Sequence, residues 1–448
     1  MASSPAQLNR TLTPTMLWGL GVGYVISGMY FGWNLGLEKG GTLGMAIATF
    51  FIIILYVCFT FSYAELACTI PKAGGAFDYA KRALGRDVGF ITGMAQAIEF
   101  IFAPPAIAFA IGAYFHLFLL NVSVETIAVF AYVLFTALNI LGVKVAATFE
   151  LVVTVLAVGE LLLFSGITLP HFQVQNLKHD AFPNGWSGVF AALPFAIWFF
   201  LGIEGVANVA EETLNPQRTI LKGFGSAILT LVVLCVLTFA GSVGVDGWRT
   251  IVYKDGATSD SPLPLALAKV AGDSGLFYHL LITVGLFGLV ASFHGLILAA
   301  GRSTFELGRV RFAPAFLGKI HPKFKTPANA LLINMVVGIV ALLSGKTPEI
   351  ITVSVFGALT LYVFSMISLL ALRKNEPGLE RPFKVPLYPL LPVAALVIGS
   401  LSFVAMCVYN PLLCGIYFLI LLVCFAFFKV FAKRGQNLEA TGIETSLP

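Results

Sequence analysis

The sequence predicts an all-α polytopic membrane protein with twelve transmembrane helices. Of its 448 residues, 58% are hydrophobic and only 11% are charged, whereas soluble domains carry about 25% charged residues. The mean hydropathy of the chain is +0.91. Apolar runs long enough to cross a hydrocarbon core of about 30 Å lie at 15–37, 42–69, 88–119, 124–142, 146–169, 188–210, 223–245, 275–300, 328–344, 350–372, 390–409 and 412–431.

Lys and Arg give the orientation, because cytoplasmic loops carry an excess of these residues. If the N-terminus is inside, most of the 27 Lys and Arg residues fall on the cytoplasmic side. The six that fall on the opposite side are Lys39, Lys178, Arg249, Lys254, Lys269 and Lys346. We therefore expect a multi-pass protein of the cell membrane, in bacteria the inner membrane, with both termini cytoplasmic. The N-terminal residues show no cleavable signal pattern.

The first run contains an unusual number of glycines between Gly19 and Gly36, and each glycine weakens a helix by roughly 1 kcal/mol. The sixth run is interrupted in the same way around Gly202, Glu204 and Gly205. Interrupted apolar segments that open two halves of a chain indicate an inverted repeat with a midplane site lined by broken helices. Close packing of helices through small residues is the alternative for the first run.

Five helices in each half give the halves opposite orientations, as an inverted repeat requires. The expected organisation is a cytoplasmic tail at 1–14, a first repeat of helices 1–5 at 15–169, an external loop at 170–187, a second repeat of helices 6–10 at 188–372, a cytoplasmic loop at 373–389, helices 11 and 12 at 390–431, and a cytoplasmic tail at 432–448.

Several function classes lack support. The six cysteines form no C-x-x-C pair and the six histidines show no H-E-x-x-H spacing, so we expect no metal site and no cofactor. The net charge of +5 comes from short loops between apolar runs, so no nucleic-acid partner is expected. No nucleophile–base pair or phosphate loop points to an enzyme. An ion channel is a remote alternative, since no filter-like segment is visible.

Glu99 is the most informative intramembrane residue. It lies about 16 Å into the third run at 1.5 Å per residue, and a carboxylate at a helix centre costs on the order of 3 kcal/mol. Gln96 is one turn earlier on the same face, and Pro104 and Pro105 follow. A carboxylate facing a midplane cavity suits an organic cation. The alternative is a protonated Glu hydrogen-bonded to a neighbouring helix.

Other polar and aromatic residues are candidates with open alternatives. Glu204 either titrates during transport or holds the broken backbone, and Glu160 serves either helix packing or a proton relay. His294 binds substrate, shuttles a proton or is a satisfied core residue. Tyr30 and Trp198 stand beside the two breaks, where they provide cation–π contacts or act as ordinary packing residues.

A set of motifs in order along the chain resembles one family. They are S-G-M-Y at 27–30, Y-A-E-L at 63–66, P-K-A-G-G-A-F-D-Y at 71–79, G-I-E at 202–204, E-E-T-L-N-P-Q-R at 211–218, H-P-K-F-K-T-P at 321–327 and R-P-F-K-V-P at 381–386. Together they resemble the amino acid–polyamine–organocation (APC) transporter superfamily almost end to end. The resemblance implies a five-plus-five inverted repeat, two further helices and alternating access around broken helices 1 and 6.

The chain departs from the family in places. Ile26 replaces a glycine of the helix-1 pattern, and the fifth helix has no Lys after Lys144, although some proton-coupled members carry one there. The coupling ion, H⁺ or Na⁺, and the oligomeric state stay open.

Helices 1–3 look most like the ethanolamine permease branch. This implies a secondary transporter that imports a small organic amine, ethanolamine first, with membrane lipid around it. An amino-acid permease is the alternative, with Ser27 and Gly28 holding the substrate carboxylate and Glu99 as a proton site. The expected substrate-binding residues are Ser27, Gly28, Met29, Tyr30, Gln96, Glu99, Trp198, Leu201, Gly202 and His294. The expected gating or coupling residues are Glu204, Glu160 and Ser292.

Overall fold

The computed structural model describes residues 10–116, 121–141, 143–273 and 275–440; the outer parts of both predicted tails lie outside these residues. The α-helices are α1 (Pro14–Val25), α2 (Ser27–Tyr30), α3 (Asn34–Thr69), α4 (Ala76–Leu84), α5 (Arg86–His116), α6 (Val124–Leu141), α7 (Val143–Thr168), α8 (Val174–Lys178), α9 (Gly185–Trp198), α10 (Pro216–Asp246), α11 (Arg249–Val252), α12 (Pro262–Ala271), α13 (Leu276–Arg309), α14 (Ala328–Leu342), α15 (Thr347–Asn375), α16 (Leu390–Tyr409) and α17 (Pro411–Ala440). The shorter elements are the 3₁₀ helices η1 (Leu169–His171), η2 (Ile203–Glu212) and η3 (Ala315–Gly318) and the strands β1 (Tyr253–Lys254) and β2 (Ala257–Thr258).

The helices confirm an all-α polytopic membrane protein. Within the described residues, ten helical spans are long and apolar enough to cross a membrane, and they cover ten of the twelve predicted runs. The run at 328–344 is the shorter apolar helix α14. The run at 15–37 is divided among α1, α2 and the first turns of α3.

Two helical segments lie outside the predicted apolar runs. The helix α17 continues to Ala440, past residue 431 where the last predicted run ends. Its last turns contain Ala, Lys, Arg, Gln, Leu and Glu, which are good helix formers outside a bilayer as well as inside. Between the predicted runs at 42–69 and 88–119 lies α4, which buries Phe77 and Tyr79 and packs on α5.

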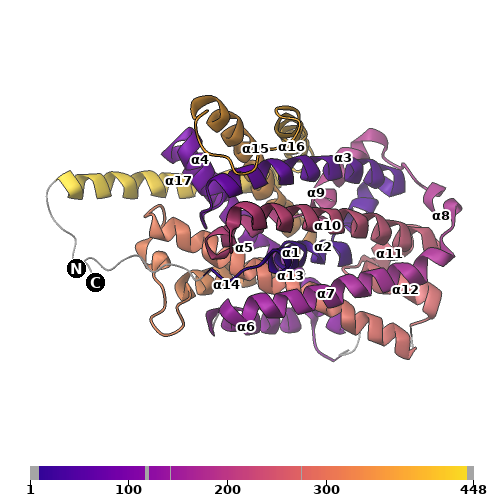
Figure 1. The fold of residues 1–448 in the computed structure, drawn as a ribbon. Coiled ribbons are helices and arrows are strands. Elements are labelled where there is room, and N and C mark those ends of the chain that lie inside the picture. Colours follow the sequence, from indigo (N-terminus) through magenta and orange to yellow (C-terminus); the bar gives the residue numbers. More distant parts are fainter. Residues whose placement is uncertain (1–9, 117–120, 142, 274, 441–448) are drawn as a thin grey trace.

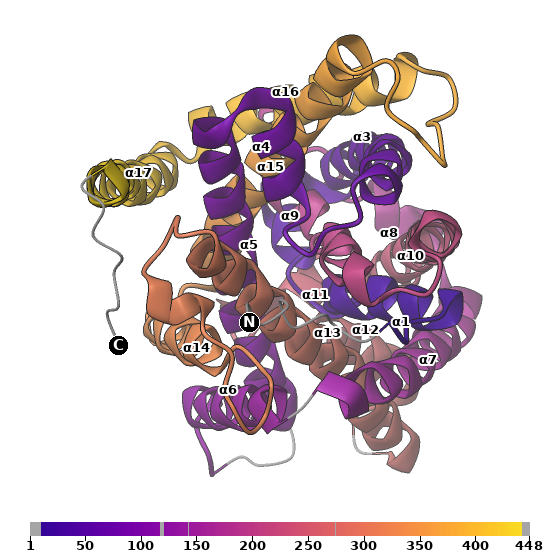
Figure 2. The ribbon, with the colours of Figure 1, turned by 60° about the vertical axis from the view of Figure 1, so that its left-hand side comes forward.

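The long helices form a bundle. In Figure 1, α3, α10 and α7 run across the view beside one another, in agreement with their packing. Figure 2 shows α1 inside the bundle near α10, α7 and α13, with α16 and α17 on the outside. The span Gly185–Glu212 is 89% buried, whereas the span of α17 is 17% buried. The broken helices are therefore central, and the last two helices are peripheral.

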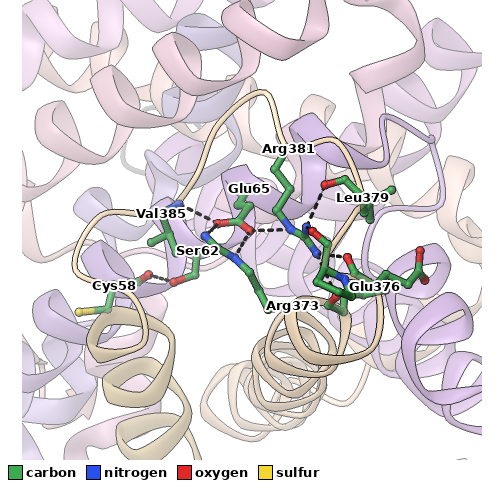
Figure 3. Close-up of polar contacts among 10 residues, drawn as sticks. Cys58, Ser62, Glu65, Arg373, Glu376, Leu379, Arg381 and Val385 are labelled. Atoms are coloured by element: carbon green, nitrogen blue, oxygen red, sulfur yellow. Dashed lines mark hydrogen bonds and ion pairs between the residues drawn. The ribbon is translucent and has the colours of Figure 1, made fainter.

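A buried ionic cluster ties α3 to the end of α15 and the segment after it (Figure 3). The Arg373 guanidinium donates to both oxygens of Glu65 at 2.7 Å, and Arg381 Nε lies 3.4 Å from Glu65 Oε1. The backbone N–H of Val385 donates to Glu65 Oε2 at 2.7 Å. Arg381 also donates to backbone carbonyls at the end of α15, including that of Leu372 at 2.9 Å. We call these four residues, Glu65, Arg373, Arg381 and Val385, the Glu65 cluster.

Candidate functional site

The first break follows α2. Helix α1 begins after Thr13, whose hydroxyl accepts from the Met16 N–H at 3.3 Å, and ends at Val25. The short α2 ends at Tyr30, after which Phe31 is extended. Gly32 then has φ +85°, a conformation that glycine adopts readily. The chain is therefore non-helical between Tyr30 and the start of α3.

The second break follows α9, which ends at Trp198. Gly202 has φ +98°, so an L side chain at this position is strained. The chain then continues as the 3₁₀ helix η2. This interruption lies at the position predicted from Gly202 and Glu204.

The two breaks are packed directly on each other. A Cβ atom at Gly28 would lie 3.0 Å from the Cα atom of Phe199 and closer still to the Trp198 carbonyl oxygen. Trp33 stacks on Phe199 with ring centroids 5.3 Å apart. Phe31 meets Trp198 edge-on at 5.5 Å. Only a residue without a side chain fits at Gly28, because the backbone of the facing break occupies the space.

Glu99 of α5 and Glu204 of η2 form what we call the acidic pair. Both are buried, and the two residues lie close to each other and to the Gly202 backbone. The Tyr362 hydroxyl donates to Glu204 Oε2 at 2.9 Å and lies 3.0 Å from the Tyr56 hydroxyl.

The acidic pair has fewer partners than a buried charge requires. Within the described residues, neither oxygen of Glu99 nor Oε1 of Glu204 receives a hydrogen bond from an N–H or O–H group. No Lys, Arg or His side chain in the same residues forms an ion pair with either carboxyl. Buried polar groups are normally satisfied, so the unmet acceptors fit a ligand with positive charge and several donors.

Gln96, one turn before Glu99, extends this polar region. Its Nε2 donates to Asn208 Oδ1 of η2 at 3.2 Å. Gln96 Oε1 and Asn208 Nδ2 have no partner within the described residues. The Trp198 indole N–H is likewise buried without an acceptor there. Leu201 is a buried apolar residue of the same break.

Tyr30 belongs to a second polar group, with Glu160. The Tyr30 hydroxyl donates to Glu160 Oε2 at 2.6 Å, and the Tyr114 hydroxyl donates to the Tyr30 carbonyl at 3.1 Å. Small residues make room for the tyrosine ring, since a Cβ at Gly288 would overlap it. A small cavity is lined by Tyr30, Tyr114 and Glu160. The structure thus brings together Tyr30, which was predicted to bind substrate, and Glu160, which was predicted to act in gating or coupling.

Ser27 and Ser292 form a third contact, between α2 and α13. The Ser27 hydroxyl donates to Ser292 Oγ at 2.7 Å, and Ser292 donates to the Tyr24 carbonyl. Met29 contributes its carbonyl to the Trp33 indole N–H at 3.1 Å. The two hydrogen bonds of Ser292 join α1 and α2 to helix α13.

His294 is not brought together with the acidic pair. Its Nδ1 lies 3.3 Å from Oε2 of Glu150 on α7, and both side chains are buried. The rings of Phe135 and Phe149 flank it. The imidazole therefore forms a polar contact between α13 and α7, and the Asn139 amide donates to the backbone carbonyl of His294.

Sequence reasoning did not select Asn208, Tyr362 or Tyr56 for the site. Asn208 lies four residues after Glu204, a spacing that a regular helix would place on one face. This spacing could have identified Asn208 as a neighbour of Glu204. Tyr362 and Tyr56 come from segments far along the chain, and no local pattern separates them from other membrane tyrosines.

A further set of contacts joins the segment before α1, the end of η2 and α13. Arg302 of α13 pairs with Glu212 Oε1 at 2.8 Å. The Glu212 carbonyl accepts from the N–H groups of Thr11 and Leu12 at 2.8 and 3.0 Å. The segment before α1 is thereby attached to the end of η2.

Comparisons with known proteins agree with this architecture. A family model described as amino acid permease matches residues 15–429. An uncharacterised transporter of Rhizobium meliloti is 29% identical over 89% of this chain and 87% of its own length. The branched-chain amino acid permease BcaP of Bacillus subtilis is 27% identical over 88% of each chain.

The low-affinity putrescine importer PlaP of Escherichia coli is 26% identical over 89% of each chain. BcaP is named as an amino acid permease and PlaP as an amine importer. The family match spans both broken helices and the acidic pair. The chain is a multi-pass transporter of amino acids or amines that belongs to the amino acid permease family of the APC superfamily.

Proposed function

We propose that this chain imports a small organic amine, with ethanolamine as the first candidate, by alternating access around the two helix breaks. The observation that carries the proposal is the acidic pair: two buried carboxyl groups with unmet acceptors that no Lys, Arg or His side chain of the described residues pairs with. An ammonium group supplies three donors and one positive charge. It is therefore the kind of ligand that this site lacks.

The neighbours of the acidic pair suggest how the rest of ethanolamine is held. Gln96 Oε1 is a buried acceptor without a donor in the described residues, one turn from Glu99, and would accept from the substrate hydroxyl. Ser27 is already bonded to Ser292 at 2.7 Å, so its hydroxyl would have to turn to reach a ligand. The carbonyls of Trp198 and Leu201 would provide further acceptors for the ammonium.

The alternative is an amino-acid permease. The relative BcaP is named as a branched-chain amino acid permease, and Ser27 and Gly28 of α2, just before the first break, would supply N–H groups for a carboxylate. In that case Glu99 would hold a proton rather than substrate. PlaP, named as a putrescine importer, keeps an amine substrate equally within the family.

Competition of uptake separates the two substrate classes. The purified protein is reconstituted in liposomes, and uptake of labelled ethanolamine is measured with ethanolamine analogues and amino acids as competitors. We expect ethanolamine analogues to reduce the uptake of labelled ethanolamine and amino acids to leave it unchanged. Competition by amino acids alone would contradict it.

The decisive variant is Glu99→Gln. It keeps the size of the side chain and removes its charge, so we expect ethanolamine affinity to fall by tenfold or more, which is about 1.4 kcal/mol. Glu306→Gln is the matched control, because Glu306 is also buried but pairs with Arg309 at 2.7 Å. Unchanged uptake in Glu99→Gln would remove Glu99 from the site.

Placement in the membrane is part of the same proposal. The concentration of Lys and Arg in the loops at one end supports a cell-membrane protein with both termini cytoplasmic and repeats at 15–169 and 188–372. Labelling of single cysteines introduced at Glu38 and at Lys323 with an impermeant reagent in intact cells tests it. Only the residue 38 cysteine should react.

A further inference from the structure

We propose that the end of the bundle where α5 meets α4 and α17 binds the headgroup of an anionic phospholipid. The site consists of three cations, Lys81, Arg86 and Lys429, around the rings of Phe312 and Phe428. We call these five residues the basic cluster. The basic cluster shares no residue with the acidic pair, so this proposal does not depend on which substrate the chain carries.

The cations of the basic cluster gather over two aromatic rings. The guanidinium carbon of Arg86 lies 5.2 Å from the ring centre of Phe312 and 5.3 Å from that of Phe428. Lys81 Nζ lies 5.5 Å from the ring centre of Phe312, and Lys429 Nζ lies 5.9 Å from that of Phe428. The two rings are buried, and their centres are 4.8 Å apart. Two packed rings therefore hold three positive charges close together by cation–π contacts.

The positive charge of the basic cluster exceeds that of its acidic partners. Lys81 and Arg86 are exposed, and neither forms an ion pair with any of the residues that the structure describes. Lys429 Nζ lies 2.6 Å from Asp87 Oδ2. Asp78, one turn before Lys81, is not in ion-pair contact with it. The cluster therefore presents unpaired positive charge that attracts an anion.

The basic cluster lies where two membrane spans end side by side. The span of α5 begins at Arg86, and the span of α17 ends at Val430, one residue after Lys429. The rings of Phe90 and Phe428 stack with their centres 4.3 Å apart, so the two span ends are in contact. Long basic side chains at the ends of membrane helices extend to the interface with water. The cluster is therefore at the depth of a phospholipid phosphate.

The outer face of α17 offers a surface for the acyl chains of such a lipid. Figure 2 shows α17 on the outside of the bundle, and its side chains Leu422 and Phe427, shortly before Lys429, are 65% and 61% exposed. Arginine binds phosphate with two parallel hydrogen bonds, and basic pockets between membrane helices bind anionic headgroups. A lipid meets both the charged and the apolar surface, whereas a soluble phosphate compound meets only the charged one.

Native mass spectrometry of the full-length protein in detergent tests this proposal. The delipidated protein is mixed with equal amounts of dioleoylphosphatidylglycerol, which is anionic, and dioleoylphosphatidylcholine, which has no net charge. We expect phosphatidylglycerol to be the preferred first lipid, and an excess of glycerol 3-phosphate to leave it bound. Equal binding of the two lipids would overturn the proposal, and so would displacement of phosphatidylglycerol by glycerol 3-phosphate, which would indicate a site for soluble anions.

One double variant assigns the preference to the basic cluster. Lys81→Gln combined with Arg86→Gln removes the two unpaired cations and should lower the affinity for phosphatidylglycerol about tenfold, because each basic residue near the headgroups adds to the attraction. Lys323→Gln is the matched control, because Lys323 is also exposed over a ring, with Nζ 5.4 Å from the ring centre of Phe324, but lies outside the cluster. Unchanged affinity in the double variant would overturn the proposal.

A variant with an expected gain separates lipid binding from any loss of folding. Asp87→Asn removes the carboxylate that pairs with Lys429 and leaves this cation free for the lipid phosphate. We expect the affinity for phosphatidylglycerol to rise and that for phosphatidylcholine to stay the same. A fall in the affinity for phosphatidylglycerol would contradict the assignment of Lys429 to the site.

Discussion

The Glu65 cluster and the acidic pair are two ways of burying carboxyl groups in one membrane protein. Glu65 receives four hydrogen bonds or ion-pair contacts from two arginines and a backbone N–H. Within the described residues, the carboxyl groups of Glu99 and Glu204 receive one hydrogen bond, from the Tyr362 hydroxyl. The first arrangement is complete without a ligand, and the second is not. The complete pairing of Glu65 fits a structural role, and the incomplete pairing of Glu99 and Glu204 supports the proposed substrate site.

The largest expected effect follows from breaking the complete arrangement. Glu65→Gln leaves Arg373 and Arg381 without their carboxylate, and Arg381 is only 5% exposed. Loss of one partner of a buried ion pair typically costs 3–5 kcal/mol. We therefore expect a clear fall in the unfolding temperature of the detergent-solubilised protein, measured by intrinsic fluorescence.

Two companions make this result specific to the Glu65 cluster. Glu376→Gln breaks the ion pair between Glu376, which is 35% exposed, and Arg82, which is 42% exposed. This change should leave the unfolding temperature almost unchanged. Arg373→Lys retains the positive charge but loses the bidentate hydrogen bonding to Glu65. Its unfolding temperature should lie between those of Glu65→Gln and Glu376→Gln. Equal losses in Glu65→Gln and Glu376→Gln would contradict the assignment of a structural role to the cluster.

The acidic pair should respond in the opposite way. Replacing both Glu99 and Glu204 by Gln removes no cation's partner, and two amides can bond to each other. We expect the ligand-free double variant to unfold within about 1 kcal/mol of the unaltered protein, or to be more stable, since buried charges carry a desolvation cost. A loss as large as that of Glu65→Gln would make the acidic pair a structural element.

A smaller effect is expected from the hydroxyl that supports Glu204. Tyr362→Phe removes the donor at 2.9 Å, and a buried hydrogen bond contributes about 1 kcal/mol. Ethanolamine affinity should therefore drop about fivefold, measured by uptake at several concentrations. Tyr253→Phe is a matched control, because it removes a hydroxyl bonded to Glu38 at 3.3 Å far from the acidic pair. Affinity unaffected by Tyr362→Phe would show that Glu204 needs no help from Tyr362.

The sequence predicted the fold and part of the site for physical reasons. Hydropathy identifies spans because every backbone group in a bilayer must be satisfied by a helix. Gly28 and Gly202 mark the breaks because glycine alone tolerates the close approach or the positive φ found there. Glu99 stands out because a carboxylate in a membrane is costly. These signals are local, so a single sequence carries them.

Partnerships between distant residues were beyond that reach. Glu99 of α5 lies close to Glu204 of η2, and the contact of His294 with Glu150 joins α13 to α7. Tyr30 was grouped with substrate and Glu160 with coupling, yet one hydrogen bond connects them. Which charged side chains meet depends on the rotation of each helix, and hydropathy does not specify it. The contacts between side chains of different helices could therefore be identified only in the folded structure.

The smallest effect is expected at Asp260. Its carboxyl is intermediate between the Glu65 cluster and the acidic pair, because the hydrogen-bond partner found for it in the described residues is one neutral hydroxyl. It lies in the segment between β2 and α12, where the Thr347 hydroxyl donates to it at 3.2 Å. Burial raises the pKa of Asp260 from 3.8 to about 6. The native state therefore binds its proton more tightly than the unfolded chain, and unfolding releases that proton between about pH 4 and pH 6. Stability contributed by this group is present at pH 4 and is lost as the pH rises to 6.

Asp260→Asn should remove this contribution to the pH profile. Unfolding temperatures are compared from pH 4 to pH 7 in the unaltered protein, in Asp260→Asn and in the exposed control Asp255→Asn. The difference between Asp260→Asn and the unaltered protein should grow in favour of the variant up to pH 6 and then stay constant, whereas Asp255→Asn should follow the unaltered profile. Parallel dependence of the unfolding temperature on pH in all three proteins would contradict this expectation. It would mean that the Thr347 hydroxyl and the surrounding solvent are enough to stabilise the Asp260 carboxylate, unlike the buried carboxylates of the acidic pair.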